Sequence, residues 1–201
     1  MSLTPQALQA IEAAVKAAEQ QTRGEIVVAV VEASDGYGGP RAAFSLVVAL
    51  AATLVALAVG APPWALAVAW PVAAALAWAL SALPALKRAL VPDDELDAEV
   101  MESAKAAFVD HGVHRTADRA GVLIYLSLLE RRVLLLGDAG IHAVVGEEGW
   151  KAHVARIVES MKRGHPEELA AVVGAVGEVL AQHFPPTVEN RNELSDAVRR
   201  S

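Results

Sequence analysis

The chain of 201 residues contains no cysteine, and this absence excludes several kinds of site. A disulfide framework, a thiolate metal site and a cysteine nucleophile all require that residue. Aromatic residues are also scarce, at 4% of a chain that is 54% hydrophobic. No site in this chain can therefore depend on a thiol.

An excess of positive charge is lacking as well. The formal net charge is −7, and the isoelectric point is about 5.4. A general nucleic-acid binder needs a basic face that neutralises phosphates. We therefore expect no nucleic-acid partner.

Charge of either sign is absent from Ala42 to Leu86, although charged residues make up 20% of the chain. Two apolar runs, Ala42–Gly60 and Trp64–Leu86, are each long enough to cross a hydrocarbon core about 30 Å thick. Pro62 and Pro63 follow Gly60 between them and form a strong helix stop. Buried helices of a soluble core would normally show a polar face, and neither run has one. The sequence predicts a transmembrane helical hairpin over residues 41–90.

Basic residues flank this predicted hairpin. Arg41 precedes it, Lys87 and Arg88 follow it, and the short turn carries no charge. The positive-inside rule then predicts a multi-pass protein of the cell (inner) membrane, with the soluble segments in the cytoplasm. The lipid bilayer is the expected partner.

Residues 1–40 and 91–184 have the pattern of one discontinuous α/β domain, and residues 185–201 that of a polar, disordered tail. Thr4 precedes Pro5 as a plausible helix cap, and the β-branched run after Gly24 is typical of a strand buried on both faces. The predicted segments are a helix Pro5–Gln21, a strand Glu25–Glu32, a flexible tether Ala33–Pro40, a helix Asp93–Asp110, a polar loop His111–Ala120, strands Gly121–Ser127 and Arg131–Gly137, and helices Glu147–Lys162 and Pro166–His183.

The order of these segments predicts the sheet. The first two strands are separated by a crossover and should be parallel, whereas the short link to the third strand indicates an antiparallel hairpin. The expected fold is α/β, a small mixed sheet sandwiched by helices and interrupted by the membrane hairpin.

Three motifs follow one another in the second half of the chain. They are Asp118-Arg119-Ala120-Gly121-Val122-Leu123-Ile124-Tyr125-Leu126-Ser127, then Glu130-Arg131-Arg132-Val133, then Gly137-Asp138-Ala139-Gly140-Ile141. With Thr22-Arg23-Gly24-Glu25-Ile26-Val27-Val28, the later Trp150 and the tail motif Asn192-Glu193-Leu194, this pattern resembles the TPM-domain family, in the bacterial branch that carries an inserted membrane hairpin. The chain departs from the family's usual Asn-Gly and Gly-Tyr-Gly at Ala120-Gly121 and Gly137-Asp138-Ala139-Gly140.

The resemblance implies an α/β-sandwich fold and leaves two functions open. Some relatives are accessory proteins or bind divalent metals, which implies a binding or accessory module at the membrane surface, with a membrane protein or a second copy as partner. Others are described as acid phosphatases, which implies a phosphatase dependent on Ca²⁺ or Mg²⁺. The chain lacks a Gly-x-Ser-x-Gly elbow and an Asp-x-Asp nucleophile motif, so a phosphatase would use metal-activated water or an atypical nucleophile.

The topology also predicts where chemistry can sit. The starts of the first two strands and the end of the third should share one edge of the sheet. Carboxylates and imidazoles gathered there can bind a divalent cation or do acid–base work, and they can equally be solvated loop residues. The expected metal ligands are Glu25, Asp118 and Asp138, and the expected phosphate or ligand contacts are Arg23, His114, Arg115 and His142.

The turn at Leu128 and Leu129 lies at the opposite edge of the predicted sheet. An apolar pair is unusual in a turn, which favours Gly, Asn and Asp. Two interpretations stay open: the pair rests on the bilayer surface, or it packs against a helix.

Overall fold

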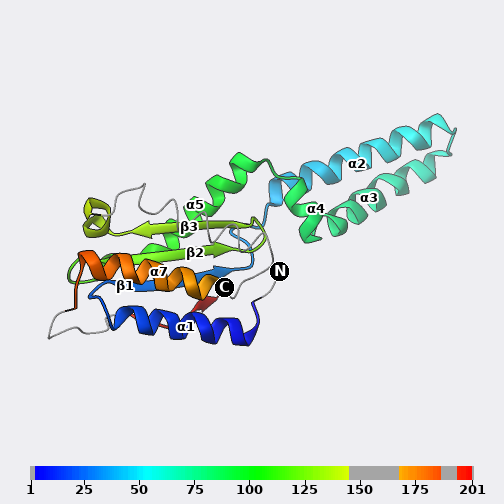
Figure 1. The fold of residues 1–201 in the computed structure, drawn as a ribbon. Helices are drawn as coiled ribbons and strands as arrows, with labels where there is room; N and C mark the ends of the chain where they lie inside the picture. The colour runs from blue at the N-terminus through cyan, green and yellow to red at the C-terminus, as the bar shows by residue number, and fades with distance from the viewer. Residues whose placement is uncertain (1–2, 145–167, 187–193, 201) are drawn as a thin grey trace. The chain divides into compact units, whose positions relative to one another are not determined.

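The computed structural model describes residues 3–144, 168–186 and 194–200, and the chain divides into two compact units (Figure 1). Met1–Ser34 and Asp97–Ser201 form the α/β unit, and Asp35–Leu96 form the hairpin unit. The predicted helix Glu147–Lys162, with Trp150, lies outside the described residues.

The α/β unit contains a mixed sheet in the order β3-β2-β1-β4. β1 and β2 are parallel, with Glu25 opposite Gly121, and β2 and β3 are antiparallel, with Val122 opposite Gly137. Both directions confirm the predictions from segment order. The strands are β1 (Glu25–Val31), β2 (Gly121–Ser127), β3 (Arg132–Gly137) and β4 (Arg199–Arg200).

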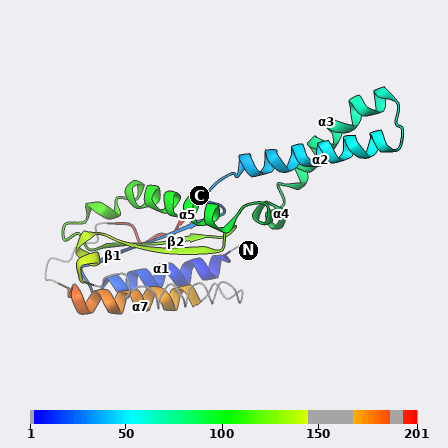
Figure 2. The same cartoon turned by 90° about the horizontal axis from the view of Figure 1, so that it is seen from above.

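Helices cover both faces of this sheet, as predicted. α1 (Pro5–Glu19) and α7 (Glu168–His183) lie on one face, and α5 (Asp93–Asp110) lies on the other (Figure 2). Every residue of β1 is buried, because alternate side chains enter the two cores. Thr4 caps α1 as expected, since its Oγ1 accepts the Ala7 N–H at 3.2 Å.

Two glycines of α7 differ in their surroundings and give a matched pair. A Cβ on Gly177 would lie 2.4 Å from the Ala18 Cβ of α1, whereas a Cβ on Gly174 would meet nothing within 4 Å. We expect Gly177→Ala to lower the free energy of unfolding by about 1–3 kcal/mol through overpacking. Gly174→Ala should raise it by up to about 1 kcal/mol, because alanine is the better helix former. Pulse proteolysis in urea measures both, and equal effects of the two substitutions would contradict this packing.

Residues 194–200 of the predicted tail are more ordered than expected. β4 pairs with β1 in parallel, with Arg199 opposite Ala29. Leu194 packs against one face's core and Val198 against the other. The expectation of a disordered tail is therefore wrong for residues 194–200. The segment that carries these two apolar residues is too short to show a periodic hydrophobic pattern in the sequence.

Two connecting segments are also more structured than predicted. The flexible tether expected over Ala33–Pro40 is shorter, because α2 already begins at Gly38. Tyr37, just before it, adopts a left-handed conformation with φ 53°, and its N–H donates to Asp35 Oδ2 at 2.5 Å. The loop His111–Ala120 contains one 3₁₀ turn, Val113–Arg115, because the fully buried Val113 anchors it to the core.

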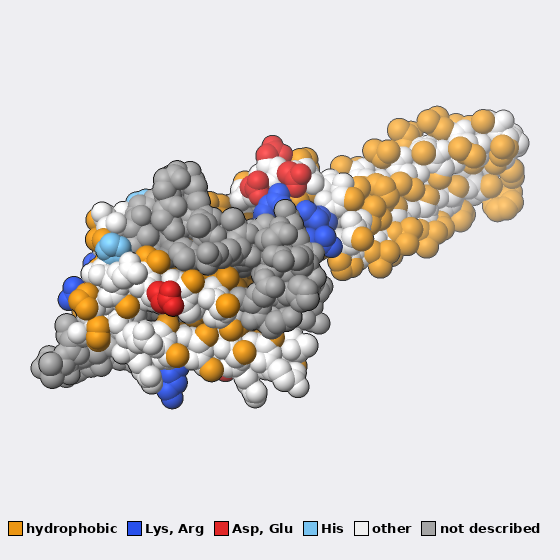
Figure 3. All heavy atoms as spheres, in the orientation of Figure 1, with side chains coloured by type: hydrophobic (Ala, Val, Ile, Leu, Met, Phe, Trp, Pro, Cys, Tyr) orange, Lys and Arg blue, Asp and Glu red, His pale blue; other side chains and the backbone are white. Residues whose placement is uncertain are grey.

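The hairpin unit contains two helices that are long and apolar enough to cross a membrane. α2 (Gly38–Ala58) and α3 (Pro63–Leu80) pack against each other and are joined by the predicted turn, in which Gly60 has φ 71°. On the face that Figure 3 shows, hydrophobic side chains cover both helices along their length. The large side chains point away from the partner helix, as the 60% exposure of Leu50 and 72% of Trp64 illustrate.

Small side chains form the contact between the two helices. Ser45 and Ala49 of α2 and Ala77 of α3 are buried, as is Ser81, the residue that caps α3. Such residues let helix backbones approach closely, which is how helices pack in lipid. The seam therefore leaves the larger apolar side chains on the outer surface.

The second predicted span ends earlier than expected. α3 ends at Leu80, whereas the apolar run continues to Leu86, and a separate short helix α4 (Pro84–Ala89) follows. Pro84 has no N–H, and its ring would clash with the carbonyl of Leu80 in a continuous helix. The residue before it, Leu83, is accordingly extended at φ −63° and ψ 128°.

The turn at Leu128 and Leu129 is tied to the α/β unit. Their N–H groups donate to the carbonyls of Val31 and Glu32 at 3.1 and 3.0 Å. Leu128 also packs against the core that α1 and α7 share with the sheet. This contact supports the packing interpretation for Leu128.

Candidate functional site

Three strand ends meet at one edge of the α/β unit, as the topology predicted. The Glu25 N–H donates to the Ala120 carbonyl at 3.2 Å, and the Asp138 N–H donates to the Gly121 carbonyl at 2.9 Å. These bonds join the start of β1, the start of β2 and the end of β3. We call residues 22–25, 113–121 and 137–142 the strand-end edge.

Two glycines of the sequence motifs let the segments of the strand-end edge pack closely against one another. A Cβ on Gly121 would lie 2.3 Å from the Val113 carbonyl oxygen, and one on Gly140 would lie 2.7 Å from that of Arg119. Real Cβ atoms do not approach backbone so closely, so both positions require glycine. Close packing in this chain thus explains two of the glycines in the motifs that carry the family resemblance.

Arginines face the two aspartates of the strand-end edge. Arg23 Nε lies 3.5 Å from Asp118 Oδ2, and Arg119 Nε lies 2.8 Å from Asp138 Oδ2. The first pair is partly exposed, whereas Asp138 is buried beside the exposed Arg119. Arg23 also stacks on Phe184, with its guanidinium carbon 5.9 Å from the ring centre. Sequence reasoning placed Asp118 and Asp138 here but missed Arg119 as a partner.

The third predicted metal ligand, Glu25, has different neighbours. Its side chain is buried, and its Oε2 accepts the Leu194 N–H at 3.2 Å. Within residues 3–144, 168–186 and 194–200, no group of three His, Asp or Glu side chains is placed to hold a metal ion. The arrangement of Glu25, Asp118 and Asp138 therefore does not by itself fit a metal centre.

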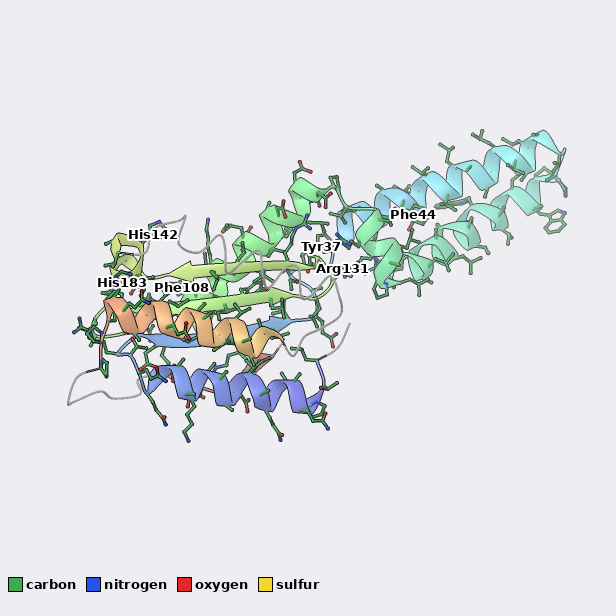
Figure 4. The ribbon with its side chains drawn as sticks, in the orientation of Figure 1. Tyr37, Phe44, Phe108, Arg131, His142 and His183 are labelled. Atoms are coloured by element: carbon green, nitrogen blue, oxygen red, sulfur yellow. The ribbon has the colours of Figure 1, made fainter. Side chains whose placement is uncertain are left out.

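The predicted ligand residues fall into separate groups. Arg115 Nε donates to His114 Nε2 at 3.4 Å, and the His114 ring lies 6.5 Å from that of Phe108. The exposed His142 donates its backbone N–H to the Asp138 carbonyl at 2.9 Å. Figure 4 shows His142 on the helical turn after β3, at the end of the unit where α7 finishes with His183.

A buried acidic group beside Glu25 escaped the sequence analysis. Glu19 of α1 is 8% exposed, and its Oε1 accepts the Ile26 N–H at 2.9 Å. Burial and, to a smaller extent, the nearby carboxylates of Glu25 and Asp196 raise the pKa of the Glu19 carboxyl to about 8, although the hydrogen bond from Ile26 acts in the opposite direction. A signal was available: Glu19 continues the four-residue spacing of Ile11 and Val15, so it occupies a core position of α1.

The C-terminal segment covers this acidic group. Glu12 Oε1 accepts the Val198 N–H at 3.2 Å, so carboxylates of α1 and β1 hold the segment through its backbone. Arg199 of the same segment acts on His111. Burial lowers the pKa of His111, the positive charge of Arg199 lowers it as well, and the carboxylate of Asp110 raises it. The segment thus brings charged groups from distant parts of the chain together.

Comparisons with known proteins support the fold. No protein-family model matches the chain, and no curated protein sequence matches it. The NMR structure of BA42 protein from the psychrophilic bacterium Bizionia argentinensis is similar in fold, with a TM-score of 0.63 at 20% sequence identity. The similarity covers 100% of this chain and 97% of that one. At this identity the likeness concerns the arrangement of the backbone.

Proposed function

We propose that this chain is a TPM-like α/β domain held in the cell membrane by the α2–α3 hairpin, and that it acts as a binding or accessory module at the membrane surface. The observation that carries the proposal is the outward-facing apolar surface of both helices, on which Leu50, Trp64 and Val68 are more than half exposed. Water disfavours a continuous apolar surface of this kind. Lipid would cover it.

The dimensions of the helices support the same proposal. α2 has 21 residues and α3 has 18, which correspond to about 31 and 27 Å at 1.5 Å per residue. A hydrocarbon core is about 30 Å thick. The order of the sheet and the helices on both its faces agree with the sandwich that the family resemblance implies.

The charges that flank the hairpin favour a cytoplasmic α/β unit. Because the chain has no cysteine, single-cysteine variants report position without background. In intact cells, an impermeant maleimide should label Ala61→Cys in the turn and leave Lys105→Cys of α5 unlabelled until the cells are opened. The reverse pattern would show that the α/β unit faces outward.

The strand-end edge supplies the surface for binding. The side chains of Arg23, Asp118 and Arg119 are 35%, 48% and 57% exposed, so both signs of charge are accessible. Exposed charges of both signs suit recognition of a complementary protein surface. A membrane protein or a second copy of the chain is the proposed partner.

The geometry favours this role over a divalent-metal-dependent phosphatase. Such an enzyme needs convergent carboxylates around its metal, whereas Asp118 and Asp138 each face an arginine. With a panel of phosphoesters, we expect phosphate release to be equal for the full chain and its Asp118→Asn/Asp138→Asn variant, with Mg²⁺, Ca²⁺ or EDTA. Metal-dependent turnover that the variant loses would establish the phosphatase instead.

A further inference from the structure

An arginine is held in place at the open end of the hairpin, where α2 begins and α3 ends. Arg41 Nε donates to Ser81 Oγ at 3.1 Å, and one of its terminal nitrogens donates to the Trp78 carbonyl at 3.4 Å. The guanidinium carbon lies 4.3 Å from the centre of the Trp78 ring. Ser81 is fully buried and its hydroxyl in turn donates to the Trp78 carbonyl at 2.7 Å.

From this arrangement we infer that Arg41, held by Ser81 and Trp78, binds the phosphate group of a membrane phospholipid. The inference rests on the proposed membrane insertion of the hairpin. A guanidinium has five N–H donors, and within the described part of the chain the hydrogen bonds of Arg41 engage two of them. The others can donate to a phosphate in the forked geometry that suits arginine.

Fixing the side chain in advance favours this binding. An arginine loses rotamer freedom when it is ordered, and here the protein has already ordered it through Ser81 and the aromatic ring. Trp78 is 43% exposed, so its ring offers an apolar surface beside the charge. The lipid's acyl chain and its phosphate would thus find adjacent partners.

The depth of Arg41 points to a lipid as the source of the phosphate. Arg41 lies in the first turn of α2, and this helix is about as long as the hydrocarbon core is thick. A spanning α2 would therefore hold Arg41 at the level of the headgroups, where tryptophan is also favoured. Basic groups between helices at this level bind lipid headgroups. The position of Arg41 thus favours a phospholipid over free phosphate as the ligand.

Native mass spectrometry of the full chain tests the inference. The protein in a phosphate-free detergent is titrated with phosphatidylglycerol, with diacylglycerol, which lacks the phosphate, and with inorganic phosphate. We expect phosphatidylglycerol to be retained, diacylglycerol to be lost, and millimolar inorganic phosphate to compete poorly. Arg41→Gln should weaken retention by about tenfold, as expected for loss of a charge-assisted pair.

Two further substitutions, at Arg41 and at Ser81, test whether the arginine must be held in place or whether positive charge alone is enough. Arg41→Lys keeps the charge but loses the fork, so it should also weaken retention. Ser81→Ala removes the Nε partner without changing charge and should weaken it severalfold. Thr53→Ala is its control, because the Thr53 hydroxyl donates within α2, to the Ala49 carbonyl at 2.8 Å, and not to Arg41. Retention by Arg41→Lys and Ser81→Ala equal to that of the unchanged protein would overturn the inference, as would preferential binding of inorganic phosphate.

Flotation of the same proteins with phosphatidylcholine vesicles keeps the two proposals apart. If all variants float but Arg41→Gln retains the lipid fully, the phosphate site is wrong and the membrane anchor stands. If the unchanged protein does not float, the anchor fails and the inference fails with it.

Discussion

Leu50→Asp together with Val68→Asp is expected to release the chain from membranes. Both side chains are exposed on the hairpin, at 60% and 54%, and both lie 12 residues from the open end of their helix. A carboxylate near the centre of a spanning helix costs about 2.5–3.5 kcal/mol on insertion scales. Two would lower membrane partition by roughly four orders of magnitude. The measurement is flotation with vesicles and resistance to alkaline carbonate extraction.

Val109→Asp provides the matched control for this experiment. Val109 is 55% exposed on α5 and lies in the α/β unit, so the same change of side chain there should leave flotation intact. Continued carbonate resistance of the double variant would mean that α2 and α3 do not face lipid.

Stability of the α/β unit is expected to fall as pH rises from about 4.5 to about 8. The folded chain holds the Glu19 proton up to a pKa of about 8, whereas an unfolded chain releases it near the usual value of 4.5. Unfolding therefore releases a proton between these values, and the free energy of unfolding decreases with a slope of up to about 1.4 kcal/mol per pH unit. Hydrogen exchange of the β1 and β2 amides, corrected for intrinsic rates, measures this slope.

Glu19→Gln should flatten this dependence. The amide oxygen can still accept the Ile26 N–H, but it carries no charge at any of these pH values, so the variant should be the more stable protein at pH 8. Glu12→Gln is the control on the same helix, because Glu12 also accepts a backbone N–H, from Val198. If Glu19→Gln kept the full slope, another group would be its cause.

Local signals were strong enough to predict most secondary structure. The Thr4 cap, the β-branched run before Glu32 and the acidic start of α5 each act over a few neighbouring residues. The end of α3 was missed although Pro84 marks it, because the apolar run continues past the proline. β4 could not be predicted, since its two residues are a strand only through pairing with β1.

Chain order by itself determined which strand ends meet, because a crossover gives a parallel pair and a tight turn an antiparallel one. It could not determine which charges pair there. Asp138 meets Arg119 because Arg119 adopts φ 54° and its carbonyl packs against Gly140, where a Cβ would not fit. Asp196 comes close to Glu19 because β4 folds back onto β1. Sequence fixes backbone direction through local geometry, whereas side-chain partners depend on distances of a few ångströms between distant segments, and only tertiary packing sets these.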